Sequence, residues 1–159
     1  MSRKYLNNRW CVRCNRNTAT PYLRQYVKQF PTKGRVLDIG CGNGRNTRFM
    51  EGLGYKVDPI DMAGDFGMKR ILGQQPLPKR KYDILLANYV LMFLNEEERS
   101  KVLEDLHDRA KRNAMLMVEM YPALDAYEYN LDNIMNFFLK KGWKRIRKSK
   151  ERFILEKEI

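Results

Sequence analysis

A glycine-rich turn after a short apolar run is the feature that most constrains this chain. Residues 36–39 (Val-Leu-Asp-Ile) predict a short buried strand, and Gly40, Gly42 and Gly44 follow it at every second position. Residues 47–50 then predict the start of a helix. Glycines let the backbone turn tightly and pass close to a ligand, because no Cβ stands in the way, and amide groups at the start of the helix would face that ligand. This order of elements indicates a nucleotide-binding arrangement in an α/β fold.

Two further polar residues fall at predicted strand ends. Residues 55–61 predict a second strand one βαβ repeat after the first, and the two should therefore be parallel. Asp61 ends this strand about 20 residues beyond the turn, where an acid accepts hydrogen bonds from both ribose hydroxyls of a bound nucleoside. Asn88 ends another apolar strand, predicted over residues 82–88. Ligands bind at such strand ends, and we expect Asp38, Asp61 and Asn88 to converge there.

The rest of the chain alternates helices and strands and closes with two adjacent strands. Pro21 after Thr18 or Thr20 predicts a helix start, and Asn95 caps a helix that runs to about residue 112. The other expected elements are a short helix over 66–72, a loop over 73–81, a strand over 114–120, a helix over 131–141, and strands over 143–147 and 152–156. This pattern predicts a doubly wound, mostly parallel α/β sheet with a C-terminal antiparallel hairpin. We expect one domain over residues 1–159, with a basic N-terminal arm and lid helix over 1–34.

The glycine spacing discriminates between nucleotide ligands. It lacks both the G-x-G-x-x-G of dinucleotide enzymes and the G-K-[S/T] of triphosphate sites. VLDIGCGNG fits the (V/L)-L-D-x-G-x-G-x-G motif of the class I S-adenosylmethionine-dependent methyltransferases, and the chain resembles that family over most of residues 19–159. GCGNGRN and the segment YDILLANYVLMFL at 82–94 resemble the tellurite-resistance methyltransferase group in particular.

The resemblance implies S-adenosylmethionine as cofactor and a role for each matching residue. The three glycines would approach its methionine portion, and Asp38 would lie near its amino group. Asp61 would bind the ribose, Met62 would pack against adenine, and Asn88 and Tyr89 would line the floor near the sulfonium. The arm and first helix would fold over the pocket. The full expected cofactor-binding set is Asp38, Gly40, Cys41, Gly42, Asn43, Gly44, Asn46, Asp61, Met62, Asn88 and Tyr89.

The sequence also departs from the family pattern. About 20 residues separate Asp61 from Tyr82, where the family fits a helix, a third strand and another turn, so we expect one of these elements to be cut down or missing. Gln74 and Asp65 are the candidates for contacting the adenine amino group. Asn88-Tyr89-Val90-Leu91 stands where exocyclic-amine DNA methyltransferases carry N-P-P-Y or D-P-P-Y, which disfavours that class.

Catalysis by this family needs little from the protein. A sulfonium methyl is already activated, so alignment of the nucleophile and exclusion of water supply most of the rate. No residue stands out as a general base, and the candidates for a catalytic role are Glu119, Tyr89 and Tyr5. We expect His107 to be a surface or packing residue and Cys41 to be a small filler inside the turn.

Charge leaves three functional hypotheses open. The net charge is +12, and residues 1–35 hold nine bases and no acid, with a second cluster of eight bases and one acid over 140–152. The leading hypothesis is methyl transfer to a small-molecule acceptor, over which Tyr5, Trp10 and Tyr22 are candidates to close, although Tyr22 also fits the core. The second is an RNA or DNA methyltransferase that uses the basic arm to hold phosphates. The third is a non-catalytic cofactor- or nucleic-acid-binding protein.

Cysteine content and hydropathy restrict the remaining classes. Cys11 and Cys14 have the spacing of zinc ligands, but only Cys41 and His107 remain to complete a site of four, so we expect no metal. Three cysteines also argue against a disulfide framework. The chain has neither an apolar run of membrane-spanning length nor the apolar core of a signal peptide, and we expect a cytoplasmic protein.

Overall fold

The computed structural model describes residues 17–63, 66–121 and 131–158. Its strands are β1 (Arg35–Ile39), β2 (Lys56–Asp61), β3 (Met68–Lys69), β4 (Tyr82–Asn88), β5 (Ala110–Glu119), β6 (Trp143–Lys148) and β7 (Arg152–Lys157). Its α-helices are α2 (Pro21–Tyr26), α3 (Arg45–Gly52), α4 (Glu96–Arg109) and α5 (Leu131–Leu139), and its 3-10 helices are η2 (Val27–Gln29) and η3 (Leu91–Phe93).

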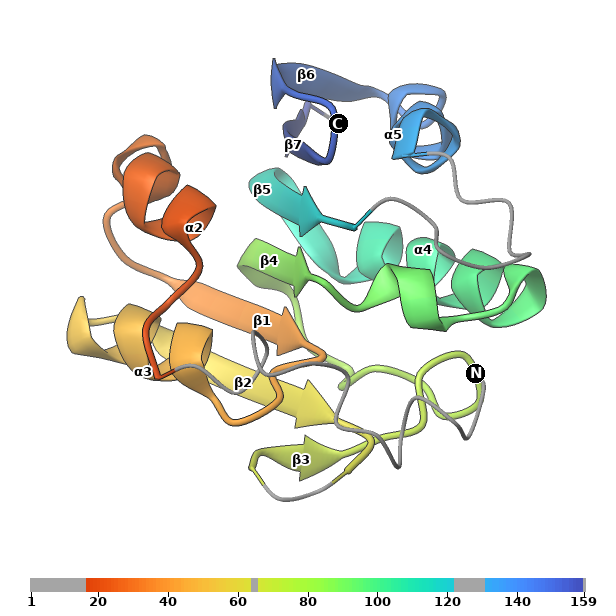
Figure 1. The fold of residues 1–159 in the computed structure, drawn as a ribbon. Coiled ribbons are helices and arrows are strands. Elements are labelled where there is room, and N and C mark those ends of the chain that lie inside the picture. The colour runs from red at the N-terminus through yellow and green to blue at the C-terminus, as the bar shows by residue number, and fades with distance from the viewer. Residues whose placement is uncertain (1–16, 64–65, 122–130, 159) are drawn as a thin grey trace.

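The strands form a single seven-stranded sheet in the order β3-β2-β1-β4-β5-β7-β6. The first five strands of this order pair in parallel, whereas β7 runs antiparallel to both β5 and β6. Helices cover both faces of the sheet, with α2 and α3 on one face and α4 and α5 on the other (Figure 1). The prediction of a doubly wound, mostly parallel α/β sheet with a C-terminal antiparallel hairpin is therefore confirmed.

Capping residues explain where two of the helices start. The Thr20 hydroxyl accepts a hydrogen bond from the Leu23 amide at 3.4 Å, and Pro21 occupies the first turn of α2. At the start of α4 the Asn95 side chain accepts from the Glu98 amide, while the Glu98 carboxylate accepts from the Asn95 amide. Both arrangements satisfy amides that have no partner within the helix, as the sequence predicts.

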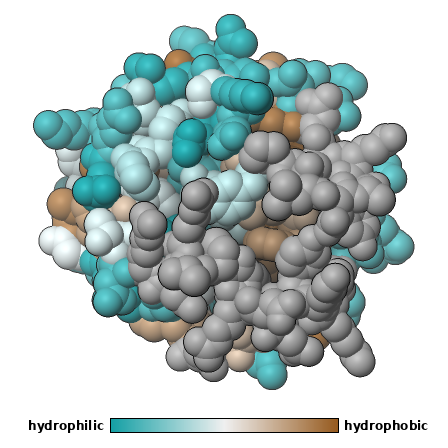
Figure 2. All heavy atoms as spheres, viewed as in Figure 1, coloured by the Kyte–Doolittle hydropathy of each residue, from teal (hydrophilic) through white to brown (hydrophobic). Residues whose placement is uncertain are grey.

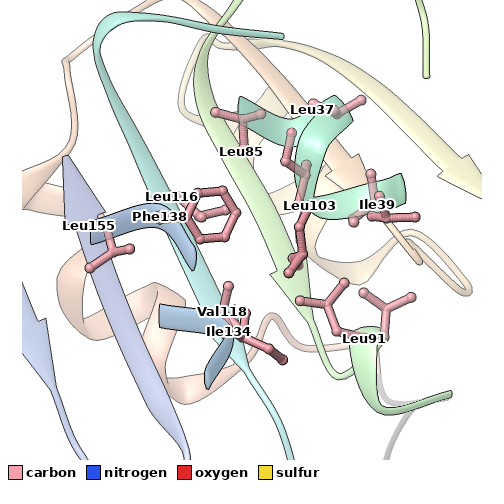
Figure 3. Close-up of a cluster of buried hydrophobic side chains, with 14 of the residues drawn as sticks. Leu37, Ile39, Leu85, Leu91, Leu103, Leu116, Val118, Ile134, Phe138 and Leu155 are labelled. Carbon is pink, nitrogen blue, oxygen red and sulfur yellow. The ribbon is translucent and has the colours of Figure 1, made fainter. Parts of the chain in front are cut away.

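Alternating side chains of the strands fill two apolar clusters. Leu37 and Ile39 of β1 belong to the larger cluster under α4 and α5, which Figure 3 shows with Leu85, Leu116 and Phe138. Val36 belongs to the second cluster, under α2 and α3. Because residues 36–39 of β1 are buried on both faces, they form an apolar run broken only by Asp38.

The short helix expected over residues 66–72 is wrong. This region instead forms β3, a two-residue strand that pairs with the end of β2 through Ile60 and Met68. Gly67 and Gly73 bracket the region, and both have positive φ angles, which an α-helix does not contain. The expectation that one family element is cut down is confirmed, because the third strand is reduced to two residues.

The boundary between α4 and β5 also lies earlier in the chain than expected. The helix ends at Arg109 rather than near residue 112, and the strand begins at Ala110 rather than Ala114. Ala110 is buried and pairs with Tyr82, after which the register shifts. Asn113, with a φ of 67°, lies within this irregular stretch. Periodicity does not reveal such a strand extension, because its four residues include three exposed polar ones.

Polar side chains dominate the visible surface. Figure 2 shows mostly hydrophilic residues among the described part of this face, with a few apolar ones between them. His107 packs against the end of the sheet, where its Nδ1 accepts a hydrogen bond from Trp143 Nε1 at 2.9 Å. His107 is half-buried, and this contact agrees with the prediction of a surface or packing residue. Within the described segments, no helix combines the length and apolar character needed to cross a bilayer.

Candidate cofactor-binding site

The glycine turn after β1 is tied to the end of β2 by backbone and carboxylate contacts. The Gly42 amide donates to Asp61 Oδ2 at 2.8 Å, and the Ala63 amide donates to Asp61 Oδ1 at 2.9 Å. The Cys41 amide donates to the Ile60 carbonyl at 3.0 Å. Asp61 is buried, with 2% of its surface exposed. The expected acid at the end of the second strand therefore also holds the turn in shape.

Close packing requires glycine at Gly40. Its φ is +68°, and a Cβ built on it would lie 2.4 Å from Cγ2 of Val90, in the segment after β4. A side chain here would meet both backbone strain and a steric clash. The turn can therefore approach the segment after β4 only with glycine at this position.

Asp38 is a buried acid at the base of the turn. Its Oδ2 accepts a hydrogen bond from the Thr47 hydroxyl at 2.6 Å. Burial raises the pKa of Asp38 to about 7, and repulsion from Asp61 adds to this rise. The Thr47 hydrogen bond and the positive charge of Arg45 act in the opposite direction. A carboxyl group in this environment is suited to a cationic partner, which would favour its ionised form.

The strands β1 and β4 end at the same edge of the sheet (Figure 1). The residues around these two strand ends line a pocket. Its lining residues are Asp38, Gly40, Cys41, Gly42, Arg45, Asn46, Asn88, Tyr89 and Val90. The structure thus brings together seven of the eleven residues expected to bind the cofactor. The other four, Asn43, Gly44, Asp61 and Met62, lie on the turn or at the end of β2 but do not line this pocket.

Two lining residues were not among the expected set. Arg45 directly follows the last glycine of the turn, so its place in the motif was a usable signal. Val90 lines the pocket because it packs against Gly40, and this contact joins segments that are 50 residues apart. Nothing in the local sequence around Val90 indicates that contact.

The floor of the pocket is backed by a buried polar network. Glu119 is fully buried at the end of β5 and accepts hydrogen bonds from Asn88 Nδ2 at 2.6 Å and from Arg152 Nε at 3.0 Å. The Tyr89 hydroxyl donates to Glu119 Oε1 at 3.3 Å and accepts from Arg152 Nη2 at 3.1 Å. Three donors converge on Glu119, and this geometry favours a positioning role over that of a proton acceptor. Arg152 was not expected here, because it lies far along the chain.

Tyr89 adopts a backbone conformation that is unusual for a bulky residue. Its φ is 58°, and its amide donates to the Glu119 carbonyl at 2.7 Å. The ring stacks on Tyr121 with centroids 4.4 Å apart. Burial, followed by the charge of Glu119, raises the pKa of the Tyr89 hydroxyl to about 12. Strained residues of this kind concentrate at functional sites, where surrounding contacts hold them in place.

The start of the first helix is linked to α3, the helix that follows the glycine turn, by the side chain of Asn46. Asn46 Oδ1 accepts a hydrogen bond from the Thr20 amide at 3.0 Å, which joins the start of α2 to α3. Tyr22 of α2 is buried in the second apolar cluster, as its alternative assignment to the core predicts. Its hydroxyl has no hydrogen-bond partner among the described residues.

The remaining candidates are a cysteine that lines the pocket, an exposed glutamine, and residues outside the part of the chain that the structure describes. Burial raises the pKa of the Cys41 thiol above its ordinary value, which agrees with a filler rather than a reactive group. Gln74 is exposed in the turn after β3. Tyr5, Trp10, Cys11, Cys14 and Asp65 lie outside the described residues.

Comparison with known proteins agrees with this geometry. A family profile described as a methyltransferase domain matches residues 4–149. None of the curated proteins compared with the sequence matches it significantly.

Three solved structures show the same fold. TehB from Haemophilus influenzae superposes with a TM-score of 0.75 at 16% identity, covering 91% of this chain and 64% of its own. A TehB-like SAM-dependent methyltransferase from Corynebacterium glutamicum gives 0.73 at 15% identity, covering 99% of this chain and 97% of its own. The 1,6-didemethyltoxoflavin-N1-methyltransferase of Burkholderia thailandensis, solved with S-adenosylhomocysteine, gives 0.65 at 14% identity, covering 87% of this chain and 76% of its own.

The fold thus matches the tellurite-resistance group that the glycine turn and the segment at 82–94 resemble. This chain spans less than two thirds of the H. influenzae protein but nearly all of the C. glutamicum one. The family profile covers most of the chain, from the N-terminal arm to the turn of the closing hairpin. The chain therefore belongs to the methyltransferase-domain family, and it has the fold of the TehB-like SAM-dependent methyltransferase from C. glutamicum.

Proposed function

We propose that the protein transfers the methyl group of S-adenosylmethionine to a small-molecule acceptor, mainly by holding the two reactants close together in the correct orientation. One observation carries this proposal. The pocket at the ends of β1 and β4 combines the glycine turn, the buried Asp38 carboxyl and the polar floor of Asn88 and Tyr89. These groups would suit the amino-acid portion and the sulfonium of the cofactor, and Asp61 and Met62 at the end of β2 would serve its nucleoside.

The residues present fit this cofactor. Asp38 would hold the ammonium group, because a positive charge beside it would offset the cost of burying its carboxylate. Gly40 and Gly42 would let the methionine portion lie close to the backbone. Asp61 uses each carboxylate oxygen once for a backbone amide. A carboxylate has about four acceptor positions, so Asp61 still has acceptor capacity for the ribose hydroxyls. Met62 is half-buried directly after the end of β2 and would pack against the adenine.

The protein contributes orientation rather than proton transfer in this proposal. The cofactor supplies a methyl group that is already activated for nucleophilic attack. Asn88 and Tyr89 would form the floor against which the acceptor is aligned, and their contacts with Glu119 hold both side chains in one geometry. Such fixed alignment provides much of the barrier reduction in a two-substrate reaction.

The composition of the fold favours a small acceptor. The described elements make up the sheet and the helices that cover it, without an added domain in the described residues to recognise a macromolecule. The B. thailandensis enzyme of the same fold is an N1-methyltransferase solved with 1,6-didemethyltoxoflavin, a small molecule.

The test follows labelled methyl groups. The protein is incubated with S-adenosylmethionine labelled in its methyl group and with a cell extract, and the products are separated by size. Label in the low-molecular-weight fraction is the expected result, and a Gly40→Val variant serves as the inactive control. Label recovered only in nuclease-sensitive polymer would overturn the small-acceptor proposal and favour a nucleic-acid methyltransferase.

A further inference from the structure

We propose that Glu119 fixes the side-chain amide of Asn88 so that Asn88 Oδ1 serves the pocket as a permanent hydrogen-bond acceptor for an N–H or O–H group of a bound reactant. This inference rests on the proposed function, because it assigns a role within the same pocket. The group that donates this hydrogen bond is either the ammonium group of the cofactor or the nucleophilic group of the molecule that receives the methyl group.

The two ends of the Asn88 amide differ sharply in their surroundings. Nδ2 donates to Glu119 Oε2 at 2.6 Å. Oδ1 is buried, and no described residue offers it a hydrogen bond. The residue as a whole is 7% exposed, yet Asn88 lines the pocket. Among the described residues, Nδ2 therefore has a hydrogen-bond partner in the protein, whereas Oδ1 has none and is available to a bound ligand.

The chemistry of Glu119 determines which way the amide faces. A carboxylate can only accept hydrogen bonds, so it must face the NH₂ end of Asn88 and not its oxygen. The other carboxylate oxygen is already occupied by Arg152 Nε and the Tyr89 hydroxyl. The Asn88 amide therefore cannot turn over without placing two acceptors against each other. Buried acceptors without a partner are costly, so a donor group in the bound complex is expected to satisfy Oδ1.

The register of the sheet builds this arrangement. Asn88 of β4 lies directly opposite Glu119 of β5, and Glu119 lies directly opposite Arg152 of β7. The three residues thus form a row across three adjacent strands, and cross-strand partners share the same face of a sheet. A ladder of this kind is rigid because each member is held by backbone pairing as well as by its side chain. Glu119 is a positioning residue in this account, acting through Asn88.

The first experiment uses calorimetry to measure how the chain of 159 residues binds S-adenosylhomocysteine and 5′-methylthioadenosine, which lacks the amino-acid portion. If the hydrogen bond to Asn88 Oδ1 comes from the cofactor ammonium, Asn88→Leu weakens S-adenosylhomocysteine binding about tenfold or more. The affinity for 5′-methylthioadenosine stays unchanged. If the hydrogen bond to Asn88 Oδ1 comes instead from the molecule that is methylated, both affinities of Asn88→Leu stay as in the wild type. Label transfer into the low-molecular-weight fraction then falls about tenfold or more. Unchanged binding together with unchanged transfer would overturn the proposal.

A double-variant comparison tests the role of Glu119. Glu119→Gln allows the facing amide to turn over, so it should reproduce the loss seen in Asn88→Leu, in binding or in transfer. Because Glu119 acts through Asn88, the double variant should lose no more than Asn88→Leu alone. Fully additive losses would overturn the positioning role. Glu156→Gln on β7, outside the row, is the matched control and should behave as the wild type.

Two further measurements keep the outcomes distinct. Failure of the wild type to bind S-adenosylhomocysteine would contradict the proposed function itself, whereas wild-type binding with unaffected variants contradicts only the role of Asn88. If Asn88→Leu does not fold, a crystal structure of the wild type with S-adenosylhomocysteine provides the test. Asn88 Oδ1 should lie within hydrogen-bond distance of the ligand ammonium or face the open acceptor side. An Oδ1 bonded to a protein group or turned toward Glu119 would contradict the proposal.

Discussion

The amide nitrogen of Gly42 lies 2.8 Å from Oδ2 of Asp61, so the acid that ends β2 also closes the glycine turn that follows β1. The other oxygen of Asp61 accepts from the Ala63 amide. Asp61 is thus expected to serve two purposes, shaping the turn and binding the ribose. Variants at this position should report on both, and the two effects can be measured separately.

Replacing Asp61 with alanine should destabilise the fold even without a ligand. Two backbone amides would lose their acceptor, which costs about 1–3 kcal/mol in the free energy of unfolding. Asp61→Asn keeps one acceptor oxygen and should lose less. Urea denaturation without ligand measures the difference. If Asp61→Ala unfolds at the same urea concentration as the wild type, the structural role assigned to Asp61 is wrong.

The buried Asp38 carboxyl should make the stability of the fold depend on pH. Its pKa rises from an ordinary 3.8 to about 7 in the folded protein, so the folded state keeps a proton that the unfolded state releases. The protonated carboxyl stabilises the fold fully below pH 3.8, and this contribution is lost as pH rises through about 7. Asp38→Asn removes the dependence.

The comparison of Asp38→Asn with the wild type isolates this effect from other titrating groups. The free energy of unfolding of the variant should gain on that of the wild type between pH 4 and pH 8, by on the order of 2–4 kcal/mol. Denaturation curves at several pH values provide the measurement. Two stability profiles that run parallel over this range would show that the pKa of Asp38 is not raised.

Two glycines with opposite surroundings should respond oppositely to alanine. At Gly40 a Cβ would meet Val90 at 2.4 Å in a left-handed backbone conformation, so Gly40→Ala should destabilise the fold by roughly 1–3 kcal/mol. Gly52 ends α3 with no atom within 4 Å of a built Cβ, so Gly52→Ala should stabilise it by about 0.5 kcal/mol. Thermal unfolding of both variants tests the pair, and equal shifts would contradict it.

Two buried tyrosines should differ in their tolerance of phenylalanine. The Tyr22 hydroxyl has no partner among the described residues, whereas the Tyr82 hydroxyl donates to Asp58 Oδ2 at 2.7 Å. Tyr22→Phe should therefore leave the free energy of unfolding unchanged or raise it, while Tyr82→Phe should lower it by about 1–2 kcal/mol. Chemical denaturation measures both. A larger loss for Tyr22→Phe would mean that its hydroxyl is bonded in solution.

The sequence predicted the glycine turn, the parallel strands around it and the capped starts of α2 and α4, because these depend on local signals. The apolar run before Gly40, the proline at Pro21 and the side-chain cap at Asn95 each specify a structure within a few residues. The same reasoning led to the expectation that a helix or strand is cut down between Asp61 and Tyr82, since too few residues remain there for the full set; the structure shows that the third strand is the shortened one.

Contacts between distant segments were beyond such reasoning. Arg152 reaches Glu119 because β7 inserts beside β5, and the sequence of the hairpin does not reveal that register. Val90 meets Gly40 for a similar reason, through the pairing of β1 with β4. The short helix expected over 66–72 was wrong, because Gly67 within the segment and Gly73 directly after it have positive φ angles.

The most direct test of the central claim is calorimetric titration of S-adenosylmethionine into the wild type, Gly52→Ala and Gly40→Val at one pH above 7. The wild type and Gly52→Ala should each bind one equivalent of the cofactor with similar affinity. Gly40→Val, whose side chain would crowd Val90 and the turn, should bind at least tenfold more weakly. Absence of binding to the folded wild type, or equal binding to Gly40→Val, would contradict the assignment of this pocket to the methyl donor.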